Sequence, residues 1–210
     1  MKTRDRIIQQ ARMLFNADGY GQVTTAGLAA ACGIAEGNLW YHFKTKRDLL
    51  DAIGQNFAAE VEVRLAMVPD PADPLGSYCD LLGGMMHELR EYRFLYRDQP
   101  SYGEHAEPIA SHIGEWLERT HECLALHLAA LVRAGLLDWP EDRLRELAIN
   151  ATVILRFGLE YRSELGEKEG GVRKTLLQHL TLFEHRLIPE AAEQIRDAIE
   201  QIGKGLKAAA

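Results

Sequence analysis

The chain has 210 residues, 47% of them hydrophobic and 26% charged, which is enough apolar material for the core of one or two folded domains. Its three cysteines lie within apolar helical patterns and predict free thiols in a reducing cytoplasm. No signal peptide and no apolar run near the ~20 residues of a membrane-spanning helix is visible. We therefore expect a cytoplasmic protein that uses neither disulfides nor a membrane.

The net charge of −7 is unevenly distributed along the chain. Residues 1–50 contain seven Lys or Arg side chains against four Asp or Glu side chains, so the acidic excess lies in the rest of the chain. A basic end on an acidic body would attract phosphates at that end only. Chance unevenness explains the same numbers, so the charge indicates nucleic acid only in combination with a motif.

Apolar residues recur at helical spacing along almost the whole chain, which predicts an all-α fold. The first helix ends at Gly19, and two short helices follow within residues 24–46. A proline-rich break at residues 69–74 then separates the fourth helix from the rest. Later helices are expected at about 75–92, as short broken pieces within 94–111, and at about 112–134, 141–165, 172–188 and 190–203.

Residues 24–46 predict a helix, a glycine turn and a second short helix. Thr25 suits the N-cap of the first helix, because its hydroxyl can accept a backbone N–H of the next turn. Gly33 supplies the positive φ at which the chain reverses. The expected buried anchors are Leu28, Ala29, Cys32, Ile34, Leu39 and Phe43. The outer face of the second helix is then polar and aromatic, which is typical of a helix-turn-helix that enters the major groove.

Residues 4–57 resemble the N-terminal domain of the TetR/AcrR family of transcriptional regulators. The matching positions are Thr25, Leu28, Ala29, Gly33, Ile34, Gly37, Leu39, Phe43, Lys46, Leu49 and Leu50. The chain departs from the family at Trp40, where a tyrosine is usual. The resemblance implies a helix-turn-helix domain over residues 1–50 and a larger helical domain over residues 51–210, bridged by the helix at about 45–66.

The expected partner is double-stranded DNA carrying a pseudo-palindromic operator, bound by a homodimer. Hydroxyls and free N–H groups at the start of a helix can hold a backbone phosphate, and an indole N–H can donate to one. The lysine is assigned to this role by the resemblance. The expected phosphate-contacting residues are Thr24, Thr25, Trp40, His42 and Lys46.

Base contacts are expected from Glu36, Asn38 and Tyr41. A carboxylate can accept from cytosine, an amide can pair with adenine, and a tyrosine ring can pack on a thymine methyl. Gly37 would let the helix approach the groove closely. Two alternatives stay open: Glu36 is favourable near a helix start for local reasons alone, and Tyr41 could be a surface aromatic without a role.

Two late segments, residues 147–159 and 176–183, are apolar around most of the helix circumference. A helix with apolar residues on both faces must be buried on both faces, either in a dimer or at the centre of a monomer. The resemblance favours a four-helix dimer interface. The expected interface residues are Leu147, Ala151, Ile154, Leu155, Leu176, Leu180 and Phe183.

The resemblance also implies a pocket for a small molecule in the C-terminal domain, whose occupation would shift the bridging helix and change the separation of the two DNA-binding heads. The candidate lining residues are Cys79, Met85, Met86, His112, Trp116, Cys123, Phe157 and Tyr161. A methionine-rich lining suits an apolar effector. Each of these residues could equally be plain core.

No catalytic motif, resident cofactor or metal site is predicted. Cys123 and His127 share a helix face, as do His87 and Glu91, but neither pair has an identifiable third ligand. We therefore expect a DNA-binding repressor, repression being usual in the family. The alternatives are a DNA-binding dimer without a small-molecule effector and, less favoured, a metal-sensing regulator.

Overall fold

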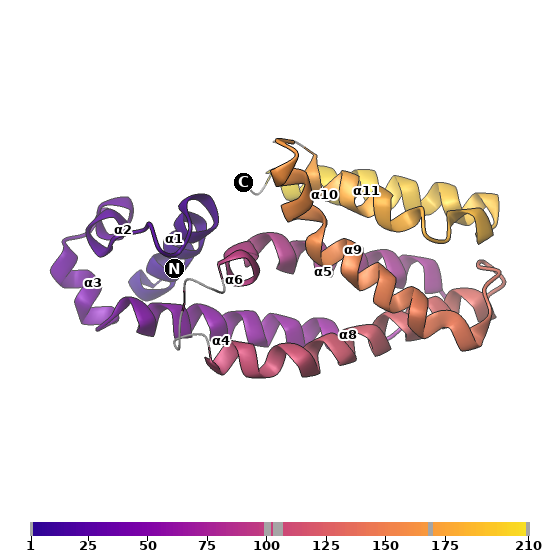
Figure 1. Ribbon diagram of the computed structural model, residues 1–210, viewed down its shortest axis with the longest axis horizontal. Helices are drawn as coiled ribbons and strands as arrows, with labels where there is room; N and C mark the ends of the chain where they lie inside the picture. The colour runs from indigo at the N-terminus through magenta and orange to yellow at the C-terminus, as the bar shows by residue number, and fades with distance from the viewer. Residues whose placement is uncertain (1, 99–101, 103–106, 168–169, 209–210) are drawn as a thin grey trace. The chain divides into compact units, whose positions relative to one another are not determined.

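The structure is a computed structural model that describes residues 2–98, 102, 107–167 and 170–208. Within these residues the chain is built from helices joined by short turns (Figure 1), which confirms the all-α prediction. Leu137 and Leu187 form an isolated antiparallel β-bridge. The α-helices are α1 (Thr3–Asp18), α2 (Thr25–Ala31), α3 (Glu36–His42), α4 (Lys46–Leu65), α5 (Pro74–Glu91), α6 (Arg93–Arg97), α8 (Glu107–Arg133), α9 (Leu144–Glu164), α10 (Gly171–Leu180) and α11 (Pro189–Ala208).

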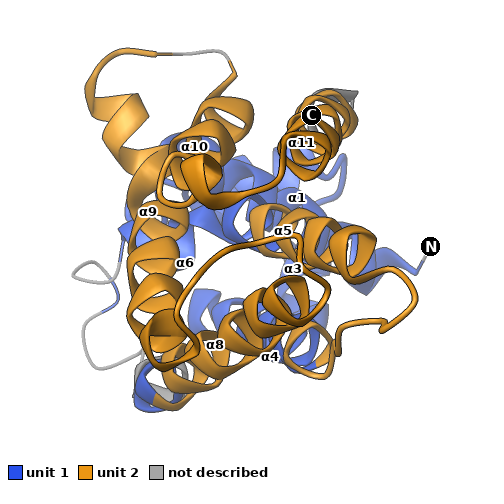
Figure 2. Cartoon of the chain, turned by 90° about the vertical axis from the view of Figure 1, so that its right-hand side faces the viewer, with its two compact units in different colours: residues 1–62, 88–114 blue, residues 63–87, 115–210 orange. Residues whose placement is uncertain are grey.

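The chain forms two compact units, each of which combines separate stretches of sequence (Figure 2). The first unit contains residues 1–62 and 88–114, and the second contains residues 63–87 and 115–210. The unit that holds the helix-turn-helix therefore includes α6, which we expected in the other part of the chain. Whether residues 1–50 form a domain that folds by itself stays a prediction.

The core of the first unit is an aromatic cluster around Phe15, near the end of α1. Its ring lies 5.1 Å from that of Tyr20 and 5.2 Å from that of Phe94, measured between centroids. Tyr20 in turn packs edge-on against Tyr102 at 5.1 Å. Such aromatic pairs stabilise beyond the area that they bury. The cluster attaches the end of α1 to α6, although 78 residues separate Asn16 from Phe94, whose backbone N–H donates to the Asn16 side chain (2.9 Å).

The second unit is a helical core in which α10 packs against both α9 and α11. Gly158 lies at the crossing of α9 and α10, where a Cβ atom would be 2.4 Å from Thr175 Cγ2, so only glycine permits this approach. On α11 a stripe at helical spacing is buried: Ala191, Ala192, Ile195 and Ile199. The opposite face of α11 is polar, as expected for a helix covering a core.

Three predicted helix boundaries were wrong, and one of them is the end of the last helix, which continues to Ala208 and not only to about residue 203. α8 begins at Glu107 and not near residue 112, with Pro108 in its first turn, where a backbone N–H has no helical partner in any case. α10 ends at Leu180 and not near residue 188, and a 3₁₀ turn at Glu184–Arg186 follows. Beyond the break, the buried ring of Phe183 packs edge-on against Tyr78 of α5, with 6.1 Å between ring centroids, so a tertiary contact accompanies the end of the local helical pattern.

Candidate nucleic-acid interface

The first helix of the helix-turn-helix is capped by Thr24. Its Oγ1 accepts a hydrogen bond from the backbone N–H of Gly27 (3.1 Å), and its backbone is extended, as an N-cap requires. The prediction that Thr25 is the N-cap was wrong by one residue. Thr25 instead lies in the first turn of α2 and donates its hydroxyl hydrogen to Glu36 Oε1 (2.8 Å). This bond joins the starts of α2 and α3.

The turn between α2 and α3 depends on Gly33, whose φ is +64°. This left-handed conformation suits glycine and lets the chain reverse after α2. The backbone N–H of Ile34 donates to Ala29 O (3.0 Å), which closes the turn in the pattern of a helix C-terminus. Leu28 and Leu39, on the facing sides of the two helices, are buried. The predicted helix–turn–helix geometry is therefore present.

The outer face of α3 is free of intramolecular burial. Tyr41 is 85% exposed, and Gly37 and Asn38 are exposed as well. A Cβ at Gly37 would meet nothing within 4 Å, so within this chain the position has no steric need for glycine. Exposure of this kind leaves Asn38 and Tyr41 available to a duplex, whereas one oxygen of Glu36 is already engaged by Thr25.

Trp40 and His42 lie at the edge of this face. Trp40 is 38% exposed and lines a small hollow that Thr24, Thr25 and Thr45 also line. The His42 ring is half-buried and packs edge-on against Tyr41, with 5.2 Å between ring centroids. Most of the other lining residues are apolar, so the hollow is not itself a phosphate site, and the phosphate contacts of Trp40 and His42 stay a prediction.

Lys46 is placed differently from an exposed phosphate contact. Its Nζ donates to the backbone carbonyls of Tyr20 and Val23, the latter at 2.7 Å, and lies 4.2 Å from the centroid of the Tyr20 ring. Desolvation by burial lowers the pKa of its ammonium. The ammonium therefore has partners inside its own unit.

Several exposed cations of the same unit were not among the expected contacts. Arg4 lies over the ring of Phe43, 5.1 Å from its centroid, and is exposed near the start of α1. Lys44 and Arg47, on either side of the α4 start, are also exposed. The signal that could have identified them is the basic excess of residues 1–50, which we did not resolve to individual side chains.

The expected effector-pocket residues separate into two groups. The buried or half-buried ones are Cys79, Met85, Met86, Trp116 and Cys123. The exposed ones are His112, Phe157 and Tyr161, so an enclosed pocket within one chain does not include these three. Phe157 and Tyr161 lie on the outward face of α9, because the opposite face of that helix packs into the core.

The buried polar groups of the second unit were missed. Tyr78 Oη lies 2.5 Å from His179 Nε2, and both side chains are buried. The buried atoms without a hydrogen-bond partner within the described residues include His179 Nδ1, Thr175 Oγ1 and His127 Nε2. No sequence signal marks such atoms, because each of these residue types is also common at surfaces.

The residues expected at the dimer interface lie mostly inside the chain's own core. Those that are buried are Leu147, Ala151, Leu155, Leu176, Leu180 and Phe183, while Ile154 is half-buried. The buried six cannot form an exposed interface, which corrects that assignment. The apolar surface of α9 is instead a stripe of exposed residues at four-residue spacing, comprising Val153, Phe157, Tyr161 and the helix-ending Leu165.

The structure brings no third potential metal ligand to the candidate pair Cys123 and His127 within the described residues. Cys123 Sγ is 3.9 Å from His127 Nδ1, but that nitrogen donates to the Cys123 carbonyl (2.9 Å). No group of three potential ligands occurs in the described part of the chain. Among the described helices, none is both long and apolar enough to cross a membrane.

The fold and the α2–α3 geometry define a helical protein with a helix-turn-helix at its N-terminus, a class that binds DNA. Comparison with known families agrees. The family model described as "Bacterial regulatory proteins, tetR family" matches residues 7–53, and that described as "Bacterial transcriptional repressor" matches residues 56–195. The chain therefore belongs to the TetR family of bacterial transcriptional regulators, which are DNA-binding proteins and not enzymes.

Individual relatives match less than half of the chain. The transcriptional regulator TtgR of Pseudomonas putida is 30% identical over 90 residues, which are 42% of this chain and 43% of that protein. A class A tetracycline repressor protein of Escherichia coli is 34% identical over 92 residues, 44% of this chain and 40% of that protein. The matched regions thus span less than half of these relatives.

Solved structures match over nearly the whole chain. A TetR-family transcriptional regulator from Marinobacter aquaeolei is 26% identical, with a TM-score of 0.76 over 96% of this chain and 99% of that chain. A gamma-butyrolactone receptor has a TM-score of 0.65 at 19% identity, covering 97% of both chains. The second likeness is one of fold alone.

Proposed function

We propose that the protein represses transcription as a homodimer that binds a pseudo-palindromic operator through α2 and α3 and leaves it when a small, mostly apolar molecule binds in residues 51–210. The observation that carries the DNA-binding part is the exposed α3 face on buried anchors. Tyr41 is a large aromatic that stays 85% exposed although its ring contacts that of the neighbouring His42. Asn38 and Tyr41 read bases in this proposal, and Glu36 reads them with the oxygen that Thr25 does not occupy.

Phosphate contacts are assigned to Thr24 and Thr25 at the start of α2 and to Trp40 and His42 on α3, all of which are exposed or half-exposed. The exposed cations near the starts of α1 and α4 add sequence-independent attraction. These two kinds of contact have different signatures. Loss of a phosphate contact weakens binding to all sequences alike, whereas loss of a base contact relaxes preference at one or two positions.

The dimer is supported by the exposed stripe on α9. Val153, Phe157, Tyr161 and Leu165 are each more than half exposed and follow one another along the helix. Monomeric proteins rarely leave large apolar side chains clustered on one face, so such a patch favours a protein interface. A second copy of the chain covers it in our proposal, and two-fold symmetry then presents two α3 helices to two half-sites.

An effector is supported by the buried polar atoms of the second unit. An unpaired buried group such as His127 Nε2 costs free energy, and a ligand with a polar group can satisfy it. Two of the similar proteins are named for small organic molecules, tetracycline and a gamma-butyrolactone. A thermal-shift screen of varied compounds tests this part: some compound should raise the unfolding temperature by mass action. A flat response across the screen would favour the dimer without an effector.

The operator is tested by selecting duplexes from a random-sequence pool at ~150 mM salt, where purely electrostatic binding is suppressed. We expect an enriched inverted repeat, which requires both base reading and a symmetric dimer. Enrichment of a single, unrepeated half-site would contradict the dimer. Recovery of no preferred sequence would contradict the assignment of Asn38 and Tyr41 to base reading.

A further inference from the structure

The turn between α1 and α2 is held from one side by Lys46. The turn begins at Gly19, whose φ is +90°, and it leaves backbone carbonyls of residues 20–23 outside any helix. Lys46 Nζ donates to two of these, Tyr20 O and Val23 O. It also lies 5.5 Å from the centroid of the Phe15 ring, which adds a cation–π attraction. One side chain at the start of α4 therefore holds the turn at two points.

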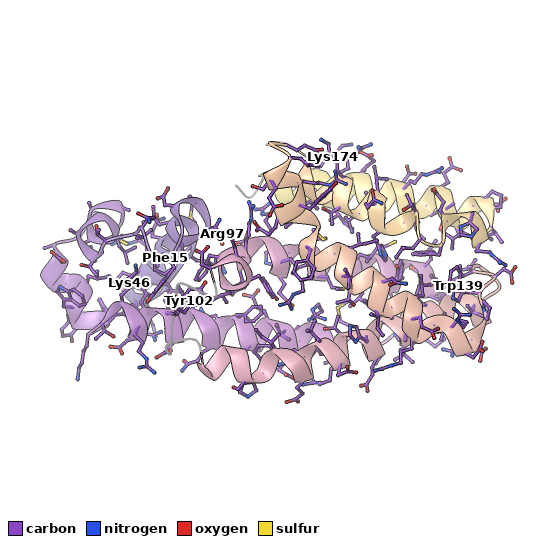
Figure 3. All side chains as sticks on the ribbon, viewed as in Figure 1. Phe15, Lys46, Arg97, Tyr102, Trp139 and Lys174 are labelled. Carbon is purple, nitrogen blue, oxygen red and sulfur yellow. The ribbon has the colours of Figure 1, made fainter. Side chains whose placement is uncertain are left out.

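The same turn is held from another side by α6 and its C-cap. Asp98 Oδ2 accepts the backbone N–H of Tyr20 (2.8 Å), and Arg97 donates to Phe15 O and Asn16 O (both 2.9 Å). Arg97 and Asp98 also pair with each other, with Nε and Oδ1 2.6 Å apart. The labelled side chains of Phe15, Lys46 and Arg97 come from α1, α4 and α6 within the first unit (Figure 3).

Burial opposes ionisation of the Asp98 carboxyl, but the hydrogen bonds from Arg97 and from the Tyr20 N–H, together with the charges of Arg97 and Arg93, hold its pKa below the usual value. Asp98 therefore bears a full negative charge at neutral pH and is a strong hydrogen-bond acceptor. Neither Lys46 nor Asp98 lies on the exposed face of α3. Both instead contact the backbone that leads into the N-cap Thr24.

We propose that Lys46 and Asp98 are positioning residues for DNA binding: together they fix the turn at residues 19–23 and so set where α2 begins. The inference rests on the proposed function, because it concerns the same interface. The path is short. Val23 precedes the N-cap Thr24, and the neighbouring Thr25 is bonded to Glu36 at the start of α3. A displaced turn thus moves the groups assigned to the phosphates and to the bases.

The first test separates a positioning role from a phosphate contact at Lys46. The full-length Lys46→Met variant is compared with the unaltered protein on the duplex enriched by the latter, over a range of salt concentrations. Loss of a phosphate contact lowers the slope of log K against log [salt] by about 0.9 per protomer. A positioning role instead weakens binding by about ten-fold or more with the slope unchanged. A reduced slope at Lys46→Met would overturn the assignment.

The second test uses the sign of a charge change at Asp98. Removing a carboxylate near DNA strengthens binding if electrostatics alone act. Asp18→Asn, at an exposed acid of α1, is the matched control and should leave affinity equal or slightly tighter. We expect Asp98→Asn to bind the same duplex at least five-fold more weakly than this control, because asparagine lacks the charge and one of the two oxygens that accept from Arg97 and the Tyr20 N–H. Affinity equal to or tighter than that of Asp18→Asn refutes the role.

A measurement without DNA distinguishes failure of this inference from failure of the proposed function. Amide hydrogen exchange at Tyr20 and Gly27 should be at least ten-fold faster in Asp98→Ala than in the matched Asp18→Ala, because alanine has no oxygen to accept the Tyr20 N–H and the turn and the α2 cap lose their anchor. Unchanged exchange means that the turn is not held by Asp98. If exchange is faster in the Asp98 variant but the unaltered protein selects no duplex, the anchoring role of Asp98 is supported and the DNA-binding proposal is contradicted.

Discussion

The buried His179 predicts that the protein loses stability in mildly acidic solution. His179 is fully enclosed in the second unit, and its Nε2 lies 2.5 Å from Tyr78 Oη. Desolvation lowers its pKa from 6.5 to about 4. Burial raises the pKa of the Tyr78 phenol well above its ordinary value, so the partner stays neutral and cannot compensate a charged imidazole.

The sign follows from which state takes up the proton. The unfolded chain protonates His179 near pH 6.5, whereas the folded chain does so only near pH 4. Stability contributed by the neutral imidazole is therefore complete above about pH 6.5 and falls as the pH decreases toward about 4. For this shift, linkage gives a loss of about 2 kcal/mol in the free energy of unfolding between about pH 7.5 and about pH 5.

Urea unfolding at fixed protein concentration measures this loss directly. Desolvation also lowers the pKa values of the buried His127 and the half-buried His121, so other groups contribute to the total. The variant His179→Gln isolates the residue, because its amide oxygen can still accept from the Tyr78 hydroxyl and it does not titrate. We expect the decrease in the free energy of unfolding on acidification to be about 2 kcal/mol smaller in the variant. Parallel pH profiles for the two proteins would refute the reasoning.

Three further perturbations test the interface and the core. Thr24→Ala removes the α2 cap and should lower the free energy of unfolding by about 1 kcal/mol in urea titrations. Thr24→Ser keeps a capping hydroxyl and should stay close to the unaltered protein. Equal losses of stability in the two variants would argue against the cap. Phe157→Glu should convert the proposed dimer to a monomer in analytical ultracentrifugation. Leu155→Ala, two positions away but buried, should instead lower the free energy of unfolding by about 2–5 kcal/mol. A Phe157→Glu protein that remains a dimer would exclude α9 from the interface. Tyr41→Ala should relax base preference at one or two positions in duplex selection, and a uniform loss across all sequences would reassign Tyr41 to the backbone.

Much of the helix-turn-helix could be predicted from the sequence, because its signals are local. Gly33 marks the reversal, and the apolar residues Leu28 and Leu39 mark the inner faces of α2 and α3 at helical spacing. The exposure of Tyr41 follows once those faces are assigned. The cap was misplaced by one residue because Thr24 and Thr25 have the same capping chemistry, and only backbone geometry separates them.

In the later helices, the local sequence pattern does not predict which face is buried. Residues 147–159 are apolar on most sides, so the sequence does not say which face meets the core. The structure buries Leu155 completely and leaves Phe157 56% exposed, although the two lie two residues apart on α9. The choice depends on which neighbouring helices pack against α9, and that information lies far away in the sequence.

By itself, the sequence determined the helical class, the position of the helix-turn-helix and the family. These depend on side-chain periodicity and turn chemistry within a few residues. Only the tertiary structure decided the partners of Lys46 and Asp98, which are Val23, 23 residues away, and Tyr20, 78 residues from Asp98. The physical reason is that a backbone carbonyl or N–H carries no side-chain identity, so no sequence pattern announces it as the partner of a distant charge.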